Sequence, residues 1–576
     1  MSLPNTTRRA FLRLCRVKNS PPAPLRTSVQ CRRYMNSSRP SPTPISRICQ
    51  ARGALPLFLF LGSLGWGLVT NLEAEEAVSP NQNASSNVNE KNEKSFRLPE
   101  IKEHGPKSER PWVIRGDRVY DITDWIAGHP GGEVILRAAG GSVEPYWKIF
   151  NIHQKQEVYD ILEMYFIGTV DPQDLVNGSV PSDAIEDPFI NDPVRDPRLH
   201  QHTSRPCNAE TPASHLSTFI TPNHVFYVRN HMWVPSPPPN TTLTIELPSG
   251  DEISIPLDDL KTKFPQHTIT STLQCSGNRR SHMTKACTHT SGLQWKAGAI
   301  GTATWTGPFL RDVLASTGFP IANPPQDAKH VQFVGHEAYG ASIPIDKALS
   351  FSGDVILAHT MNSAPIPPDH GYPLRVVVPG HVAARSVKWL SKIAISDEES
   401  TSQWQRRDYK SFGPNERGLE DWSKAKSIQE MPVNSAVTSV VPLPGGGFVV
   451  KGWAYSGGGR EIVRVDVSTN GGRSWDQAVL KEEQELGSSS KHWAWKQWRY
   501  TIPSYTISDA KSKSENLEGK KKAKMTLVVK ATDEAYNTQP EKFEPIYNVR
   551  GNLAVAWHRV PLSVEKLERR ERKGEN

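Results

Sequence analysis

One tract of this chain limits what the rest can fold into: residues 171–196, where Pro, Asp, Asn and Ser dominate. This composition offers little apolar surface to bury and is typical of a linker. At 576 residues the chain is also too long for a single hydrophobic core. The sequence therefore predicts separately folded domains on the two sides of a flexible linker at 171–196.

The N-terminal region has the composition of a targeting segment. Residues 1–72 contain no Asp or Glu, and eleven Lys or Arg lie between Arg8 and Arg52. This bias is typical of a mitochondrial transit peptide. An apolar run at 54–69 follows, slightly short for a stable membrane span. We predict a presequence at residues 1–76 that delivers the protein to the mitochondrial intermembrane space and leaves no lasting membrane anchor; a permanent N-terminal anchor is the alternative.

The net charge of +8 does not describe the mature protein. Without the eleven N-terminal cations, the remainder carries about −3. A nucleic-acid partner requires a basic face, so this balance argues against one, whereas it is compatible with a basic protein partner. The cysteines that remain are Cys207, Cys275 and Cys287, and three scattered cysteines do not form a disulfide framework.

By composition, the remaining chain is predicted to be a multidomain α+β protein. Residues 77–95 are a polar, disordered spacer, and residues 96–170 form the first folded unit. Short apolar runs broken by Pro and Gly at 197–426 predict a mixed α/β domain. From 427 to 565 polar and apolar residues alternate, which predicts an immunoglobulin-like β-sandwich. Residues 566–576 are a short charged tail.

The last domain gives three specific expectations. Alternation in the segment 462–468 predicts that its three valines share one face of a strand. The opposite face would carry Ile462, Arg464, Asp466 and Ser468. The sequence Asn-Gly-Gly at 470–472 supplies the positive φ angles of a tight hairpin. Residues 509–524, rich in Lys, Ser and Glu, are predicted to form a solvated loop.

His129 and His153 are candidate heme ligands. His129 begins the sequence His-Pro-Gly-Gly, and such a sharp loop can present an imidazole nitrogen to an iron without a bulky side chain in the way. His153 lies 24 residues later, before a predicted amphipathic helix. Two imidazoles would saturate an iron, which then carries electrons and does not bind oxygen. The alternative is a Pro-Gly turn with two unrelated histidines.

Residues 96–170 resemble cytochrome b5 through these two histidines and the aromatic and acidic residues that precede His129. The resemblance implies a small α+β domain that binds heme b. It assigns His129 and His153 as the axial ligands of the heme iron.

Cys275 is the cysteine with the most informative surroundings. It lies in the sequence Leu-Gln-Cys-Ser-Gly-Asn-Arg-Arg, which ends in Arg279 and Arg280. A thiolate is a soft metal ligand, and neighbouring cations lower the pKa of a thiol. This position could therefore hold a heavy metal that acts on a small anion. The alternative is a buried structural cysteine.

Several long motifs in one order resemble the molybdopterin domain of sulfite oxidases. They lie at residues 227–231, 273–280, 369–380, 387–390 and 404–410. With the cytochrome b5-like unit in front and the β-rich unit behind, residues 98–562 resemble the animal and fungal type of sulfite oxidase. The resemblance implies a molybdopterin-binding catalytic domain at 197–426 and a β-sandwich dimerisation domain at 427–565.

The resemblance also implies the ligands of the molybdenum cofactor. Cys275 would be the thiolate ligand to molybdenum. The pterin and its phosphate would be held by Tyr227, Val228, Arg229, Asn230, His231, His370, Arg375, Ser386, Val387 and Lys388. Ser386 departs from the family pattern, since the animal enzymes have a histidine there. Glu337 is a weaker candidate that could replace an aspartate at the cofactor.

For the substrate, the resemblance implies an anion pocket. Its members would be Arg229, Arg280, Arg550, Tyr409, Asp408 and Trp295. Guanidinium groups hold small oxyanions through charge-assisted hydrogen bonds. Arg550 belongs to the predicted β-rich domain, so that domain is expected to complete the site.

The implied function is molybdenum-dependent oxidation of sulfite to sulfate, with electrons passed through the heme to cytochrome c. The β-rich domain implies a homodimer, and the linker implies that the heme domain swings towards the molybdenum pocket. One alternative is a nitrate reductase-like molybdoenzyme, in which the heme would follow the molybdenum domain and not precede it. Another is a non-catalytic b-type heme electron carrier with a degenerate molybdenum domain.

Overall fold

The computed structural model describes residues 94–129, 132–149, 151–185, 187–238, 240–416, 418–444, 446–483, 489–515, 524–563, 565 and 569. The predicted presequence, its apolar run at 54–69 and most of the predicted spacer lie outside these residues. None of the helices in the described part of the chain has both the length and the apolar character needed to cross a bilayer.

The N-terminal domain, residues 94–180, is built on a five-stranded sheet in the order β1-β5-β3-β2-β4. These strands are β1 Ser95–Phe96, β5 Phe166–Val170, β3 Arg118–Asp121, β2 Trp112–Arg115 and β4 Gly141–Ser142. Alternate residues of β2 enter different cores, since Val113 packs with Leu162 whereas Ile114 packs with Ile101. The helical segments are α1 Leu98–Glu103, η1 Thr123–Gly128, η2 Gly132–Ala138, α2 Glu144–Trp147, η3 Asn151–Gln154 and α3 Gln156–Glu163. The predicted helix after His153 is confirmed as α3.

Two stretches of the predicted linker make specific contacts. Near its start, the carboxylate of Asp174 accepts hydrogen bonds from the Arg97 guanidinium at 2.7 Å and from the backbone N–H of Leu98 at 2.8 Å. Towards its end, Phe189 is buried, and the carboxylate of Asp187 accepts a hydrogen bond from Arg205 at 2.8 Å. The start of residues 171–196 is therefore bonded to the N-terminal domain, and the last part of this stretch is bonded to the central domain.

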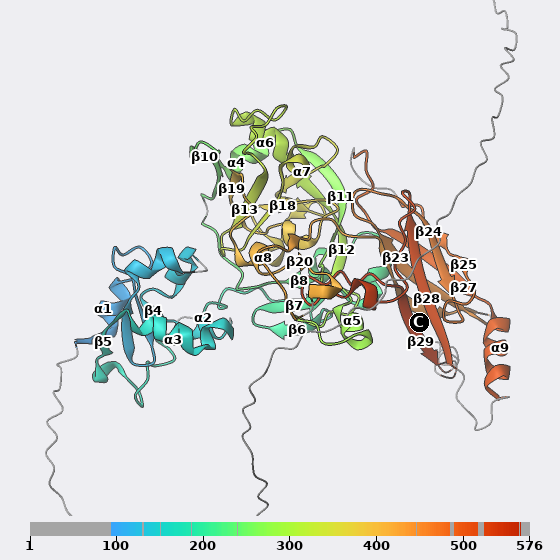
Figure 1. Cartoon of the computed structure of the whole chain (residues 1–576), viewed down its shortest axis with the longest axis horizontal. Helices are drawn as coiled ribbons and strands as arrows, with labels where there is room; N and C mark the ends of the chain where they lie inside the picture. Colours follow the sequence, from blue (N-terminus) through green and yellow to red (C-terminus); the bar gives the residue numbers. More distant parts are fainter. Residues whose placement is uncertain are drawn as a thin grey trace, which may run out of the picture. The chain divides into compact units, whose positions relative to one another are not determined.

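The central domain, residues 197–427, combines two larger sheets with short helices (Figure 1). One sheet has the order β10-β9-β19-β13-β14, and β19 runs parallel to β9 but antiparallel to β13. Its strands are β10 Glu252–Pro256, β9 Thr242–Glu246, β19 Leu390–Ser396, β13 His330–Gly335 and β14 Gly340–Pro344. Helices α4 Leu257–Thr262, α6 Leu310–Ser316 and α7 Ile345–Leu349 contribute to the same core.

The second sheet of this domain has the order β11-β12-β16-β17. Its strands are β11 His267–Gln274, β12 Ile300–Gly307, β16 Thr360–Met361 and β17 Ala364–Pro365. β11 and β12 are rich in threonine, whose branched side chain favours strands. Thr268 bonds Thr306 across the pair at 2.8 Å, and Thr272 bonds Thr302 at 2.5 Å. The smaller elements are β6 His200–Ser204, β7 Cys207–Glu210, β8 Val228–Arg229, β15 Ile356–Ala358, β18 Arg375–Val377, α5 Arg280–Ala286 and α8 Gln403–Arg406.

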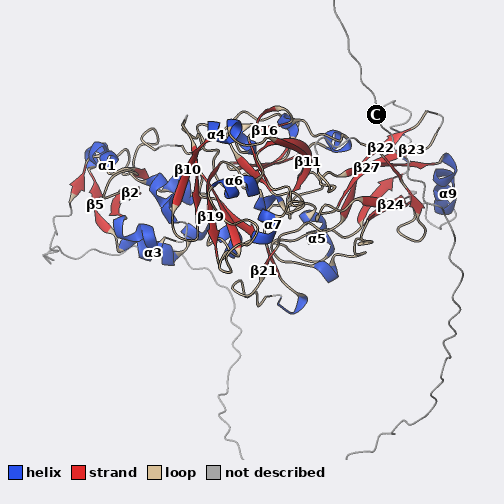
Figure 2. Cartoon of the chain, turned by 90° about the horizontal axis from the view of Figure 1, so that it is seen from above, coloured by secondary structure: helices blue, strands red, loops and turns tan. Residues whose placement is uncertain are grey.

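The C-terminal domain is the predicted β-sandwich, and strands dominate it (Figure 2). Two four-stranded sheets, β22-β23-β27-β26 and β25-β24-β28-β29, enclose one core. The strands are β22 Asn434–Pro442, β23 Phe448–Tyr455, β24 Ile462–Ser468, β25 Asp476–Gln477, β26 Val479–Leu480, β27 Lys496–Ile502, β28 Lys524–Asp533 and β29 His558–Ser563. Gly471 and Gly472 have φ angles of 80° and 100°, as predicted for the hairpin between β24 and β25.

Two predictions for this domain were wrong. The three valines of β24 do not share a face, because a bulge between Ile462 and Arg464 shifts the register against β28. Ile462 thus enters the core with Val465 and Val467, whereas Val463 is 42% exposed. The predicted loop at 509–524 begins as the end of helix α9 Ser504–Glu515, and its last residue opens β28.

The bulge can be tested by comparing two valines of β24. We expect Val465→Ala to lower the stability of the C-terminal domain by about 2 kcal/mol, because it leaves a cavity in a closed core. Val463→Ala should change it by less than about 0.5 kcal/mol, because that side chain faces solvent. The measurement is the shift in melting temperature of this domain by calorimetry, and equal shifts would contradict the bulged register.

Candidate cofactor and substrate sites

Cys275 is held directly after the end of β11. Its backbone N–H donates to the carbonyl of Ala299 at 3.0 Å, and its carbonyl accepts from the N–H of Asn278 at 2.9 Å. These bonds fix a turn between β11 and helix α5. The Cys275 side chain is buried and lines a cavity of the central domain.

The cavity is formed by segments that lie far apart in the sequence. The residues from the predicted site that line it are Tyr227, Arg229, His231, Cys275, Glu337, His370, Arg375, Ser386, Val387, Lys388 and Tyr409. Val228 and Asn230 are buried beside it but are not part of its lining. The structure thus brings together all the central-domain motifs that carried the resemblance.

One wall of the cavity carries buried cations. Arg375 donates to the carbonyl of His370 and to the carbonyl of Ser386, both at 2.8 Å. The Lys388 ammonium donates to the carbonyl of Asp369 at 2.9 Å and to the side-chain oxygen of Asn230. The chain can turn here because Gly371 has a φ of 113° and leaves room for both cations, where a Cβ would lie 3.1 Å from Cβ of Arg375 and of Lys388.

Burial shifts the pKa values of these groups strongly. It lowers the pKa of Lys388 to about 7, against the opposing effect of Asp369 and Glu337. It also lowers the pKa of Arg375 to about 10 and that of His370 to about 4. Desolvation disfavours a charged form, so each of these groups gains from an anion placed in the cavity.

Tyr409 and His231 form a pair in the same cavity. The Tyr409 hydroxyl lies 3.2 Å from Nε2 of His231, and Tyr409 has a φ of 46°, in the left-handed region. Burial raises the pKa of Tyr409 to about 12 and holds the pKa of His231 well below its ordinary value, so the phenol stays protonated and the imidazole neutral. The structure therefore gives His231 a hydrogen-bonding partner that the sequence did not indicate.

Two of the three predicted anion-binding arginines do not line the cavity. Arg280 donates to the side-chain oxygen of Asn552 and to the carbonyl of Leu293 at 2.6 Å. It lies over the Cys275 turn, since a Cβ at Gly277 would lie 2.5 Å from Nη2 of Arg280. Arg550 pairs with the Asp408 carboxylate through two hydrogen bonds of 3.0 and 2.9 Å. Asn552 and Arg550 both come from the C-terminal segment.

Trp295 is fully buried and packs in the cluster that contains Cys275 and Tyr227. Its loop is anchored by Glu210, which the sequence analysis did not identify. The Glu210 carboxylate accepts from the backbone N–H groups of Lys296 and Gly298 and contacts Nε2 of His202 at 2.8 Å. The His202 ring in turn meets the Trp295 ring edge to face. An isolated Glu and His carry no sequence signal for this role.

Ser386 and Glu337 are the two positions at which the sequence departs from the family pattern. The Ser386 hydroxyl accepts from the backbone N–H of Val378 at 3.0 Å, so its side chain is used within the chain. Glu337 is buried, and burial raises the pKa of its carboxyl group to about 8. Within the described residues its Oε2 atom has no hydrogen-bond partner, and neither does Nε of Arg375.

The two predicted heme ligands face each other in the N-terminal domain. The rings of His129 and His153 are nearly parallel, at 10°, with centroids 6.3 Å apart. Nδ1 of His129 lies 3.1 Å from the carbonyl of Gly132, which fixes the tautomer and leaves Nε2 as a metal ligand. Burial lowers the pKa of both imidazoles, that of His153 to about 4, so both are neutral as iron ligation requires.

Three family models match the chain in order. The cytochrome b5-like heme/steroid binding domain matches residues 97–171, the oxidoreductase molybdopterin binding domain matches 231–404, and the Mo-co oxidoreductase dimerisation domain matches 425–565. The sulfite oxidase of Gallus gallus is 44% identical over 473 residues, which cover 80% of this chain and 98% of that protein. The mitochondrial sulfite oxidase of Homo sapiens is 41% identical over 516 residues, covering 87% and 90%. The chain belongs to the sulfite oxidase family.

Two other matches are more distant. Nitrate reductase [NADH] 1 of Phaseolus vulgaris is 32% identical over 392 residues, which cover 64% of this chain and 42% of that protein. The crystal structure of the sulfane dehydrogenase SoxCD from Paracoccus pantotrophus has a TM-score of 0.50 at 24% identity, over 66% of this chain and 88% of that one. This last likeness shows the fold alone.

The residues present fit both cofactors of the family. A buried thiol suits molybdenum, and the cationic wall with its unpartnered Arg375 Nε suits an anionic pterin phosphate. The unpartnered carboxyl oxygen of Glu337 suits a hydrogen-bond donor on the pterin. In the N-terminal domain, two neutral, parallel imidazoles suit a six-coordinate heme iron.

Lys388 predicts a pH dependence of stability for the cofactor-free protein. The pKa of Lys388 in the folded chain is about 7, below the unfolded value of about 10.4. Between these values the unfolded chain binds more protons, so stability should rise with pH. When the cofactor is bound, the phosphate of the pterin should keep Lys388 charged, and the contribution of Lys388 to the rise of stability with pH should disappear. Melting temperatures at pH 7 and 9.5, with and without cofactor, measure the effect.

Two substitutions provide controls for this prediction. Lys388→Met should make the rise smaller in the cofactor-free protein, and Lys347, whose pKa burial lowers to about 8, should account for part of the rise that remains. Lys392→Met should leave the full rise in place, because the Lys392 ammonium is paired with Glu246 and Glu252 at the surface. Parallel pH curves for the parent protein and Lys388→Met would contradict a depressed pKa at Lys388.

Proposed function

We propose that this protein oxidises sulfite to sulfate at a molybdenum bound by Cys275, and passes the electrons through a b-type heme to cytochrome c. The observation that carries the proposal is one cavity that combines a buried thiol with Arg229, Tyr409 and a wall of buried cations. Arg280 adds a third guanidinium over the Cys275 turn. This arrangement suits a thiolate-bound metal that acts on a small oxyanion.

The bound molybdenum cofactor supplies oxygen-atom transfer and accepts two electrons. The chain supplies the positive field that concentrates and orients sulfite, through Arg229 and Arg280. The Tyr409 hydroxyl, held against His231, stays protonated and donates or accepts a hydrogen bond without adding negative charge. Trp295 is buried in the same hydrophobic cluster as Cys275 and makes the surroundings of the thiol more apolar. Asp408 fixes Arg550 and so limits how far that cation reaches.

His129 and His153 would hold the heme iron, and the heme would supply one-electron transfer. An iron saturated by two imidazoles transfers electrons with no ligand exchange. Cytochrome c is the proposed acceptor, supported by the mildly acidic balance of the chain after its N-terminal region.

The similarity to sulfite oxidases also supports a proposal for the location and assembly of the protein. The relatives in Homo sapiens and Drosophila melanogaster are named mitochondrial sulfite oxidases, and the N-terminal composition of this chain is that of a transit peptide. We place the mature protein in the intermembrane space. The match to a dimerisation domain at 425–565 supports a homodimer.

Cys275→Ser tests the proposed reaction. We expect the parent protein to oxidise sulfite and not to reduce nitrate, and the variant to lose sulfite oxidation by at least about a thousandfold, because a serine hydroxyl does not ionise near neutral pH and does not replace the thiolate ligand. The heme spectrum of the variant should remain intact. Turnover with sulfite and with nitrate, measured side by side with molybdenum and heme content, decides the outcome. Sulfite oxidation that survives in the variant would refute the ligand assignment.

Gly277→Ala tests the position of Arg280. The added Cβ would lie 2.5 Å from Nη2 of Arg280 and 3.1 Å from the Trp295 ring, so the guanidinium must move. We expect KM for sulfite to rise at least about tenfold, the effect of losing one charge-assisted hydrogen bond. Gly141→Ala is the matched control, since its nearest contact would be 3.8 Å away. An unchanged KM in Gly277→Ala would remove Arg280 from the anion site.

A further inference from the structure

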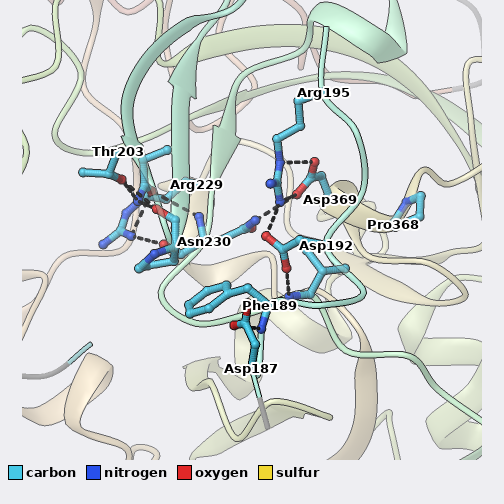
Figure 3. A network of polar contacts seen from close by, with 12 residues as sticks. Asp187, Phe189, Asp192, Arg195, Thr203, Arg229, Asn230, Pro368 and Asp369 are labelled. Carbon is cyan, nitrogen blue, oxygen red and sulfur yellow. Dashed lines mark hydrogen bonds and ion pairs between the residues drawn. The ribbon is translucent and has the colours of Figure 1, made fainter. Parts of the chain in front are cut away.

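The second half of the linker supplies an arginine to the cofactor site. Arg195 donates through Nε and Nη2 to the two carboxylate oxygens of Asp369, each at 2.9 Å (Figure 3). The same Nη2 donates to Asp192 at 2.7 Å, whose other oxygen accepts from the backbone N–H of Val234 at 3.0 Å. The Arg195 side chain is 18% exposed and that of Asp369 only 9%. Arg195 thus fastens the linker to the central domain by a largely buried ion pair.

Asp369 connects this pair to the cavity. Its Oδ1 atom accepts a hydrogen bond from the side-chain amide of Asn230 at 2.9 Å. The oxygen of that amide accepts from Lys388, which also donates to the backbone carbonyls of Asp369 and Arg229, at 2.9 and 3.1 Å. One continuous set of hydrogen bonds therefore joins the Arg195 guanidinium to the Lys388 ammonium.

The ion pair determines the charge and direction of Asp369. Burial alone would raise the pKa of this carboxyl group, but the bonds from Arg195 lower it below its ordinary value. An ionised Asp369 needs donors on both oxygens, and Arg195 with Asn230 provides them. A carboxylate that lost Arg195 would stay buried with a single donor, and would turn towards Lys388 and compete with the anionic ligand of that ammonium.

We propose that Arg195 is a positioning residue of the molybdopterin site, contributed by the interdomain linker. It holds Asp369 against Asn230, and through Asn230 it sets the position of Lys388 and Arg229. The linker segment 187–196 is then a fixed part of the catalytic domain, and swinging of the heme domain is confined to the residues that precede it. The kinetic part of this inference rests on the proposed function, whereas cofactor retention does not.

Retention of the pterin in the full-length protein is the first measurement. We compare Arg195→Gln, Asp369→Asn and the double variant with the parent, following release of pterin by its fluorescence after gel filtration. Arg198→Gln is the matched control, because Arg198, two residues beyond the segment 187–196, makes the same two-bond contact with Asp196 but is 55% exposed. We expect Arg195→Gln and Asp369→Asn each to release pterin at least about tenfold faster than the parent, and Arg198→Gln to match the parent.

The double variant shows whether the two side chains act together. It should release pterin no faster than the worse single variant, since residues of one network are not additive. KM for sulfite should rise in Arg195→Gln, with a smaller change in kcat. Arg195→Lys retains the charge, so its pterin release and its KM should both lie between those of Arg195→Gln and the parent.

Parent-like retention and KM in Arg195→Gln, or additive effects in the double variant, would overturn the inference. If Arg195→Gln does not accumulate as folded protein, judged by calorimetric melting of its central domain, the same double-variant cycle is made with Arg195→Lys and Asp369→Asn. A parent protein that retains pterin but does not oxidise sulfite would refute the proposed function and leave the retention result to decide the role of Arg195.

Discussion

Buried positive charge without a matching carboxylate is the constraint on which the central cavity depends. Arg375 contacts two backbone carbonyls, and Lys388 contacts carbonyls and an amide; neither has a carboxylate within ion-pair distance in the described part of the chain. Burying such groups costs free energy, which the depressed pKa values of both record. An anionic ligand relieves that cost, so its binding is linked to the stability of the folded domain.

Segments that lie far apart in the sequence pack around the site and shield its buried charges from solvent. Arg280 is held by Asn552, and the backbone N–H of Leu553 donates to the carbonyl of Ser276, next to the thiol. On the other side of that loop, Ser291 donates its N–H to the carbonyl of Val549. The loop that connects β28 to β29 thus packs among the turns around Cys275. The C-terminal domain therefore contributes to the geometry of the site as well as to assembly.

The features that could be predicted from the sequence are those that depend on a local pattern or on the order of motifs. The three-part fold, the histidines of the heme site and the lining around Cys275 could all be predicted, because each rests on a motif or a periodicity. The face of Val463 could not, because one bulge reverses alternation and no residue type marks it. The role of Arg195 was hidden for a different reason. Its partner Asp369 lies 174 residues away, and a composition typical of a linker gave no sign of a buried ion pair.

Burial affects the acidic groups of the cavity as it affects the cations, because it disfavours their charged forms. Each carboxyl or phenol near the thiol is either neutralised or paired. Burial raises the pKa of Glu337 to about 8 and that of Tyr409 to about 12, so both are mainly uncharged at neutral pH. Asp408 is paired with Arg550, and Asp369 with Arg195. Since no free negative charge remains among these groups, the field of the guanidiniums and Lys388 acts on a bound anion unopposed. The pairing of Asp369 by a linker residue is therefore part of what makes the cavity positive.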